Sequence, residues 1–253
     1  MDDHAGRTPR RLTPAAGMTK AVVFDVDFTL IYPGPTFQGP GYRAFAARHG
    51  VDVDPARFDE AVTSAAALLH LPDDTPYDDD IHVRYTRHIL EHMGGRGEAL
   101  DVVAREIYRE WAACQHFELY DEVPGVLREL VDAGLRIGLI SNSHRCLASF
   151  QAHFELDGLI TATVSSSEHG LMKPHPSIFN AALTLLGVSA GEAVMVGDSQ
   201  PHDIEGALQA GMRAVLLHRA ERTHPRAGEL ADRGVPTVRS LREVPALIAG
   251  GWR

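Results

Sequence analysis

The chain has 253 residues, of which 44% are hydrophobic, a length that suits one large domain or a core with an insertion. Its 24 basic residues against 34 acidic ones give a formal net charge of −10, which argues against nucleic acid as a main partner. No apolar run approaches the roughly 20 residues of a membrane span, and two cysteines, Cys114 and Cys146, are too few for a disulfide framework. We therefore expect a cytoplasmic protein with no membrane partner.

The N-terminal segment, residues 1–18, is rich in arginine and proline. No apolar stretch follows its arginines, although a secretory or twin-arginine signal would need one. We therefore expect a disordered tail over residues 1–18, and Met18 is a candidate for the true start of the chain.

The first predicted strand, residues 21–24, runs straight into a pair of acids. The stretch "KAVVFDVDFTLIY" places Asp25 and Asp27 one residue apart, followed by Thr29. Along an extended chain the two carboxylates point to the same side, and two unit charges about 4 Å apart repel by about 4 kcal/mol at an effective dielectric near 20. A shared proton, a basic residue or a metal ion must offset this repulsion. Taken alone, the pair also fits two turn or N-cap aspartates.

The next long segment, residues 37–117, shows helical patterns and no convincing strand pattern. One of its helices begins with Asp54 as N-cap and Pro55 in the first turn. An all-helical insertion therefore follows the first strand. Its helices are expected near residues 41–49, 54–69, 78–93 and 98–114.

The remaining chain alternates between short apolar runs and amphipathic helices. Ser240–Glu243 has the form of a capping box at the start of a late helix. Strands that alternate with helices indicate an α/β fold with a parallel, doubly wound sheet. Strands are predicted at residues 135–140, 159–164, 193–196 and 213–217, and helices at residues 124–134 and 176–187.

Polar side chains follow the predicted strands where they end. Ser141 and Asn142 follow the second core strand, Lys173 comes after the third, and Asp198 follows the fourth, with Asp203 five residues later. In open α/β sheets, ligands bind outside the carboxyl ends of the strands. These residue types suit phosphoryl transfer, because one carboxylate can attack phosphorus, a second can protonate the leaving alkoxide, and lysine, hydroxyl and N–H groups can hold phosphoryl oxygens. Acids that bind Mg²⁺ would complete such a site and offset the repulsion between them.

Four short motifs make the chain resemble the haloacid dehalogenase (HAD) superfamily of hydrolases, in the class with a helical cap between the first two motifs. Each motif alone is weak, but four in order over about residues 19–250 are specific. The resemblance implies a Rossmann-like α/β core over residues 19–36 and 118–253 and a helical cap domain over residues 37–117. The motifs are "DVDFTL" for D-x-D-x-T, "ISNS" for the Ser or Thr that ends the second strand, "KP" at 173–174, and "GDSQPHDIEGA" at 197–207.

The resemblance assigns catalytic and metal-binding roles to three acids. Asp25 would be the nucleophile and a Mg²⁺ ligand. Asp27 would act as general acid, then as base for the attacking water, and would bind the metal through its backbone carbonyl. Asp198 would be the other side-chain ligand of the metal.

The resemblance also implies a phosphoryl-binding set, formed by Thr29, Ser141, the backbone at Asn142, and Lys173. Asp203 would orient Lys173 or a metal-bound water. The alternative for Asp203, a helix N-cap, stays equally open.

The acid at Asp27 favours one reaction type within the superfamily. Dehalogenases of this kind lack an acid there, because hydrolysis of a halide ester needs no proton donor, whereas an alkoxide leaving group does. The implied activity is a Mg²⁺-dependent phosphatase that hydrolyses a small phosphorylated metabolite through an aspartyl-phosphate intermediate. A 2-haloacid dehalogenase and a phosphomutase are alternatives. The expected partner is a small-molecule phosphate ester, and the oligomeric state is left open between monomer and homodimer.

Two readings belong to other classes of protein. "HILEH" fits H-x-x-E-H, an inverted zinc-protease motif that would place His88 and His92 on one helix face. A third ligand is not evident downstream, and a packed or solvated helix face is the better interpretation. A non-catalytic binding module is the other alternative, and the complete set of Asp25, Asp27, Lys173 and Asp198 argues against it.

Two positions depart from the family pattern. Phe28 stands where the family often has glycine, and since Phe disfavours positive φ, we expect ordinary dihedrals and a side chain packed under the cap. His175 follows the Lys-Pro pair and receives no role. The cap should close over the site as a lid, but helix phase cannot say which of its residues point inward. The candidates are Tyr32, Phe37, Tyr42, Tyr77, His82, Arg84 and Tyr85.

Overall fold

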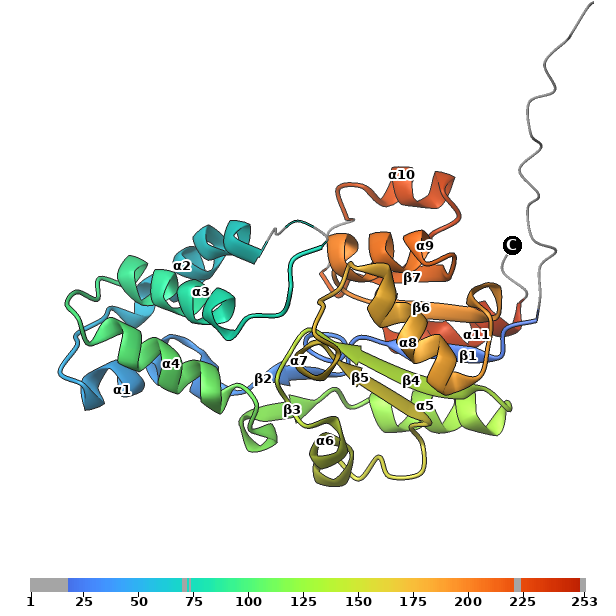
Figure 1. Cartoon of the computed structure of the whole chain (residues 1–253), viewed down its shortest axis with the longest axis horizontal. Coiled ribbons are helices and arrows are strands. Elements are labelled where there is room, and N and C mark those ends of the chain that lie inside the picture. The colour runs from blue at the N-terminus through green and yellow to red at the C-terminus, as the bar shows by residue number, and fades with distance from the viewer. Residues whose placement is uncertain (1–17, 70–71, 73, 221–223, 251–253) are drawn as a thin grey trace, which may run out of the picture.

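The computed structural model describes residues 18–69, 72, 74–220 and 224–250, so the predicted tail up to residue 17 lies outside the described residues. Its centre is a parallel six-stranded sheet with the order β5-β4-β1-β6-β7-β8 (Figure 1), and a separate two-stranded ribbon joins β2 to β3. This confirms the predicted α/β class with a parallel, doubly wound sheet. The strands are β1 (Ala21–Phe24), β2 (Ile31–Pro33), β3 (Phe117–Leu119), β4 (Arg136–Ser141), β5 (Ala162–Ser165), β6 (Ala193–Gly197), β7 (Arg213–Leu217) and β8 (Thr237–Val238).

Strand β1 is fully buried and lies between β4 and β6, with Val22 opposite Ile137 on one side and Val194 on the other. Its side chains alternate between two hydrophobic clusters, one on each face of the sheet. Helices α5, α6 and α11 pack in the first cluster and α8, α9 and α10 in the second. The sheet is therefore covered on both faces, which is why its strands read as continuous apolar runs.

The helices of the insertion, α1 to α4, form a group beside the core (Figure 1). Within the described residues, none of the helices is long and apolar enough to cross a membrane. The helices are α1 (Gly39–Arg48), α2 (Phe58–Ala65), α3 (Asp79–His92), α4 (Leu100–Glu110), α5 (Val123–Asp132), α6 (Leu147–His153), α7 (Ser166–His169), α8 (Pro176–Leu186), α9 (Gly206–Gln209), α10 (Ala227–Asp232) and α11 (Val244–Ala249).

Several predicted boundaries need correction. The helix expected over residues 54–69 is regular only in α2 and is flanked by 3₁₀ turns, and the one expected over 98–114 ends at Glu110. The strand expected at 159–164 begins only at Ala162. The capping box at Ser240 is present and precedes α11 through a short 3₁₀ turn.

The ribbon of β2 and β3 was missed by the sequence interpretation. Its strands pair antiparallel, with Tyr32 opposite Glu118, and they bring the two chain crossings between core and helices side by side. Each strand has three residues, which is too short for a recognisable alternation. A second link joins the two parts, because the Tyr77 backbone N–H donates to the Gly170 carbonyl at 2.9 Å, just before Lys173.

The turn after β1 also differs from expectation. Phe28 has φ +64°, a left-handed conformation that costs an L-residue about 1–2 kcal/mol. The turn is closed by bonds from the Phe28 N–H to the Ile31 carbonyl and from the Leu30 N–H to the Val26 carbonyl, and Arg219 donates to the Thr29 carbonyl at 3.0 Å. These contacts outweigh the local preference of Phe, so the prediction of ordinary dihedrals was wrong.

Candidate active site

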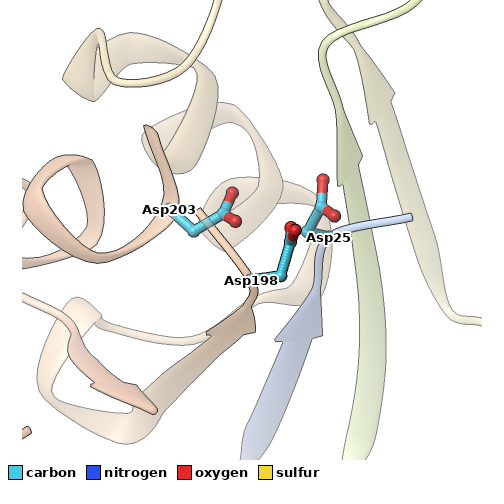
Figure 2. Close-up of side chains that lie close together, drawn as sticks. All are labelled: Asp25, Asp198 and Asp203. Carbon is cyan, nitrogen blue, oxygen red and sulfur yellow. The ribbon is translucent and has the colours of Figure 1, made fainter. Parts of the chain in front are cut away.

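The carboxyl ends of β1, β4 and β6 meet at one edge of the sheet. Asp25 directly follows β1, Ser141 ends β4, and Asp198 directly follows β6. The Asp25 N–H donates to the Val196 carbonyl at 3.0 Å, so the backbone there is held as an extension of the strand. The carboxylates of Asp25, Asp198 and Asp203 converge at this edge, as Figure 2 shows.

Lys173 is the buried hub of this cluster. Its ammonium donates to Asp25 Oδ1 at 2.5 Å, to Asp203 Oδ1 at 2.7 Å and to the Ile140 carbonyl at 3.1 Å, and only 3% of the residue is exposed. The Asn142 side chain holds its backbone from both sides, accepting from the Lys173 N–H and donating to the Lys173 carbonyl. The lysine is thus fixed before any substrate arrives.

Both carboxylate oxygens of Asp203 are occupied. Oδ1 accepts from Lys173, and Oδ2 accepts from the Ser199 N–H at 3.0 Å. The residue that caps the following helical turn is Ser199, whose hydroxyl accepts from the His202 N–H. Gly197 makes room for this arrangement, since a Cβ there would lie 2.2 Å from Asp203 Oδ2. These contacts favour orientation of Lys173 over helix capping.

The electrostatics of the cluster show an excess of negative charge. Burial, together with repulsion from Asp203 and Asp27, raises the pKa of Asp25 to about 7 despite the attraction of Lys173. The Asp198 side chain reaches solvent, but loss of hydration in the cleft and repulsion from Asp25 and Asp203 raise its pKa to about 8. Burial would lower the pKa of Lys173, yet attraction to Asp203 and Asp25 leaves it raised.

A divalent cation fits this charge distribution. With all three carboxylates ionised, three negative charges face the single positive charge of Lys173, which leaves −2. Ligand oxygens of the three acids lie within 4.8 Å of one another. Asp25 Oδ2 is buried without a hydrogen-bond partner among the described residues, so it and Asp198 remain available as ligands. An all-oxygen donor set of this kind suits Mg²⁺, which usually retains several waters.

Asp27 lies beside this cluster and has a partner that the sequence interpretation missed. Arg145 Nη1 donates to Asp27 Oδ1 at 2.9 Å and to Oδ2 at 3.0 Å, and Ser141 Oγ lies 3.4 Å from Oδ2. The arginine is 1% exposed, stacks over the Phe117 ring and donates through Nη2 to the Trp111 carbonyl at 2.8 Å. It therefore ties Asp27 to the C-terminal end of the last cap helix. The only sequence signal was a basic residue four positions after Ser141.

Thr29 is not brought together with the other predicted phosphoryl-binding residues. It is fully buried, its hydroxyl has no partner among the described residues, and it lines neither cavity beside the site. Its expected phosphate contact finds no support in this geometry. His175 caps helix α8, where its side chain accepts from the Ser177 N–H.

Two cavities adjoin the cluster between core and cap. One of 140 Å³ is lined by Lys173, Asn142 and His82, among others. The other, of 200 Å³, includes Asp27 and Phe28. Of the seven cap candidates, Tyr42, His82 and Tyr85 line the larger cavity and the other four do not; Tyr108, Trp111 and His144 also line it and were not among the candidates.

The zinc motif does not assemble into a metal site. His88 Nε2 lies 2.9 Å from Ser64 Oγ, His92 Nδ1 lies 3.0 Å from the His88 carbonyl, and Glu91 accepts from Arg87. Within residues 18–69, 72, 74–220 and 224–250, the only group of three metal-ligating side chains is Asp25, Asp198 and Asp203.

Comparisons with known proteins agree with this architecture. The family model for haloacid dehalogenase-like hydrolases matches residues 19–211. Glyceraldehyde 3-phosphate phosphatase from Pyrococcus abyssi is 38% identical over 211 residues, which cover 78% of this chain and 81% of that protein. Phosphoserine phosphatase from Thermus thermophilus is 35% identical over 146 residues, but the match spans only 55% of its length.

A solved structure shows the same fold. The crystal structure of a HAD phosphatase from Thermococcus onnurineus superposes with a TM-score of 0.64 at 23% identity, covering 93% of this chain and 100% of that chain. The family match and the extended similarity to the Pyrococcus protein identify the chain as a member of the haloacid dehalogenase-like hydrolases.

Proposed function

We propose that this hydrolase is a Mg²⁺-dependent phosphatase that acts on a small phosphate ester through an aspartyl-phosphate intermediate. The observation that carries the proposal is the position of Asp27. It is a second carboxyl group two residues from Asp25, beside the Lys173 cluster, and Arg145 and Ser141 fix it there. An ester oxygen that leaves as an alkoxide needs such a proton donor.

In the first half-reaction, an Asp25 carboxylate oxygen attacks phosphorus and the bond from phosphorus to the ester oxygen breaks. The alkoxide takes the proton of the Asp27 carboxyl group, which must turn from Arg145 toward the leaving oxygen to deliver it. Lys173, fixed by Asp203 and Asn142, holds phosphoryl oxygens together with the Ser141 hydroxyl and the backbone at Asn142. Asp25, Asp198 and the Asp27 carbonyl would hold Mg²⁺, which supplies neutralisation of the phosphoryl charge.

In the second half-reaction, Asp27 takes a proton from water and the resulting hydroxide attacks phosphorus. The bond between phosphorus and the Asp25 oxygen breaks, which releases phosphate and restores the carboxylate. Asp27 begins this half as the carboxylate left by the first proton transfer, and Arg145 Nη1, at 2.9 Å, is the cation that faces it.

The relatives support a phosphate ester as substrate. The Pyrococcus abyssi and Thermus thermophilus proteins are named as phosphatases of glyceraldehyde 3-phosphate and phosphoserine, both of which are small. A cap over residues 37–117 that closes on the site would exclude larger substrates. A cytoplasmic location stays an expectation, consistent with two free cysteines.

The test is an assay of purified protein against a panel of phosphate esters and against 2-chloropropionate, with and without Mg²⁺. We expect Mg²⁺-dependent release of phosphate and no release of halide. Metal-independent halide release would support the dehalogenase alternative. Transfer of the phosphoryl group to an added sugar phosphate, in place of water, would support the phosphomutase alternative.

A further inference from the structure

The larger cavity borders the proposed proton donor, so it would receive the alcohol part of the ester. It measures 200 Å³, below the roughly 300–1,000 Å³ of ordinary ligand pockets. Its walls come from the turn after β1, from helices α3 and α4, and from the loop after β4. Most of its lining is apolar or aromatic, including Phe28, Tyr42, Ile107 and Trp111. A leaving group bound here must therefore be compact and present an apolar side.

The described lining of the cavity offers no cation to receive an anion. Among these residues none is lysine or arginine, and the only acid is Asp27, the proposed proton donor. Arg145 lies beneath Asp27 and is committed to that ion pair. Asp79 accepts hydrogen bonds from Tyr77 and Tyr108 behind the wall, and although burial opposes it, these bonds leave the pKa of Asp79 lowered. A carboxylate in the cavity would therefore meet no cation among the described lining residues.

Two imidazoles in the wall have buried ring nitrogens without a hydrogen bond to the described residues. His82 Nε2 is buried without a hydrogen bond to the described residues, and the same holds for both ring nitrogens of His144, although the Arg109 carbonyl lies near its ring. The Tyr108 ring packs against both imidazoles, at centroid distances of 5.5 Å and 4.2 Å. Burial lowers the pKa of both histidines, so they are neutral near pH 7. Neutral imidazole both donates and accepts hydrogen bonds, which suits a hydroxyl or carbonyl group.

Phe28 forms the wall nearest to Asp27 at an energetic cost. It keeps a left-handed backbone, its residue surface is 46% exposed, and its ring centroid lies 6.4 Å from that of Trp111. Strained residues persist where the surrounding structure fixes them, and they cluster at functional sites. A phenylalanine in this conformation gains little from its own burial, so contact with a ligand offers a reason for it.

We infer that the substrate is the phosphate monoester of a small, uncharged alcohol whose apolar or aromatic side contacts Phe28 and Trp111 and whose hydroxyl or carbonyl group bonds to His82 and His144. The inference rests on the proposed phosphatase activity and narrows it. A trimethylammonium group would meet the aromatic walls but would leave both imidazoles without partners. Leaving groups with a carboxylate would find no cationic partner among the described residues of the wall.

The test compares kcat/KM, with Mg²⁺ present, for esters of similar size and different charge. Glycerol 3-phosphate, 3-phosphoglycerate and phosphocholine present a hydroxyl, a carboxylate and a quaternary ammonium group. We expect glycerol 3-phosphate to exceed both others by at least about tenfold. Equal or better hydrolysis of either charged ester would overturn the inference and leave the phosphatase proposal intact. Failure to hydrolyse any ester, p-nitrophenyl phosphate included, would overturn both.

Substitutions in the cavity wall test the roles assigned to His82 and Phe28. His82→Ala should reduce the ratio of kcat/KM for glycerol 3-phosphate to that for propyl phosphate by about tenfold. Phe28→Ala should reduce the ratio of kcat/KM for benzyl phosphate to that for methyl phosphate by about tenfold. Leu185→Ala is the matched control, since Leu185 is an exposed apolar residue of α8 and should change neither ratio. His82→Lys should raise hydrolysis of 3-phosphoglycerate relative to glycerol 3-phosphate. Unchanged ratios in the folded His82 and Phe28 variants would remove these residues from the alcohol site.

Discussion

The edge of the sheet and the cavity under the cap differ in how their polar groups are satisfied. At the sheet edge the charged groups hold one another: Lys173 has three acceptors, Asp203 has two donors, and Asp27 is paired with Arg145. In the cavity, by contrast, buried ring nitrogens of His82 and His144 lie beside the Tyr108 ring and have no hydrogen bond to the described part of the chain. We therefore propose that the chemical step depends on the rigid, charged arrangement, whereas substrate selection depends on the polar groups of the cavity that a ligand can still bind.

Substitutions in the two regions should therefore have different effects on activity. Loss of a group at the sheet edge should remove most of the activity for every ester, because each group there is proposed to act on the phosphoryl centre. Loss of a group in the cavity should change the order of preference and leave hydrolysis of activated esters largely intact. The experiments below run from the largest expected effect to the smallest.

The largest effect is expected for the nucleophile. Asp25→Asn keeps the side-chain volume and removes a charge that burial disfavours, so the protein should fold while activity falls at least about a thousandfold for every ester. Phosphate release and circular dichroism measured together check this. Retention of more than a few per cent of the activity by a folded variant would exclude Asp25 as the nucleophile.

Metal binding should depend on pH in a defined direction. The pKa values of Asp25 and Asp198 are about 7 and about 8 in the fold, against 3.8 in an unfolded chain. The folded protein therefore binds more protons than the unfolded chain between about pH 4 and 8, and the free energy of unfolding of the metal-free protein falls as pH rises through this range. At the proposed site Mg²⁺ would bind the ionised carboxylates, so its stabilising effect should be small at pH 5.5 and large at pH 8.5. At ten times Kd it would add about 1.4 kcal/mol, or several degrees in Tm.

Thermal melts with Mg²⁺ or EDTA at pH 5.5 and 8.5 measure the stabilisation by Mg²⁺. EDTA should also abolish phosphatase activity. Asp198→Asn should eliminate the Mg²⁺ shift, whereas Asp157→Asn, an exposed acid away from the site, should retain it. A Mg²⁺ shift that is equal at both pH values would contradict the proposed metal site.

Arg145 should affect both stability and the choice of leaving group. Arg145→Met leaves the partly buried Asp27 carboxylate unpaired, which should lower the free energy of unfolding by about 3 kcal/mol. It should lower kcat/KM for alkyl phosphates at least about tenfold more than for p-nitrophenyl phosphate, whose leaving group needs no proton. Arg145→Lys should recover part of both losses. Arg226→Met, which removes an exposed ion pair, is the control. If Arg145→Met lowered kcat/KM equally for alkyl phosphates and p-nitrophenyl phosphate, Arg145 would have a purely structural role.

The smallest effect concerns the backbone at Phe28. Phe28→Gly and Phe28→Ala both remove the ring, but glycine accepts φ +64° without strain, so the glycine variant should be more stable than the alanine variant by about 1 kcal/mol. Urea unfolding of the two variants checks this difference. A more stable alanine variant would show that the turn relaxes to ordinary dihedrals when the ring is absent.

The sequence was most informative where backbone pairing determines position. Asp25, Ser141 and Asp198 end or directly follow strands with long apolar runs, so the sheet order alone places them at one edge. Arg145 was missed because its guanidinium reaches Asp27 from a loop, and no periodic pattern indicates that path. Phe28 was misjudged because local preference favoured an ordinary turn, whereas hydrogen bonds across the turn and Arg219 enforce another.

In the insertion, the sequence predicted the helices but not the directions of their side chains. Helices near 41–49 and 78–93 were predicted and are present as α1 and α3. Whether Tyr42 or Tyr77 lines the cavity depends on how these helices pack against the core, and the period of 3.6 residues does not contain that information. Apolar helix faces that turn toward a partner protein or toward a cavity look alike in sequence.

Asp25 is proposed to carry the phosphoryl group during turnover. The test is rapid acid quenching of the enzyme during turnover of an ester that it hydrolyses in the presence of Mg²⁺, followed by peptide mass spectrometry. We predict a phosphoryl adduct on Asp25 that hydroxylamine removes and that is absent in Asp25→Asn. Phosphoryl transfer to a different residue, or an adduct that persists in the folded Asp25→Asn variant, would contradict this assignment.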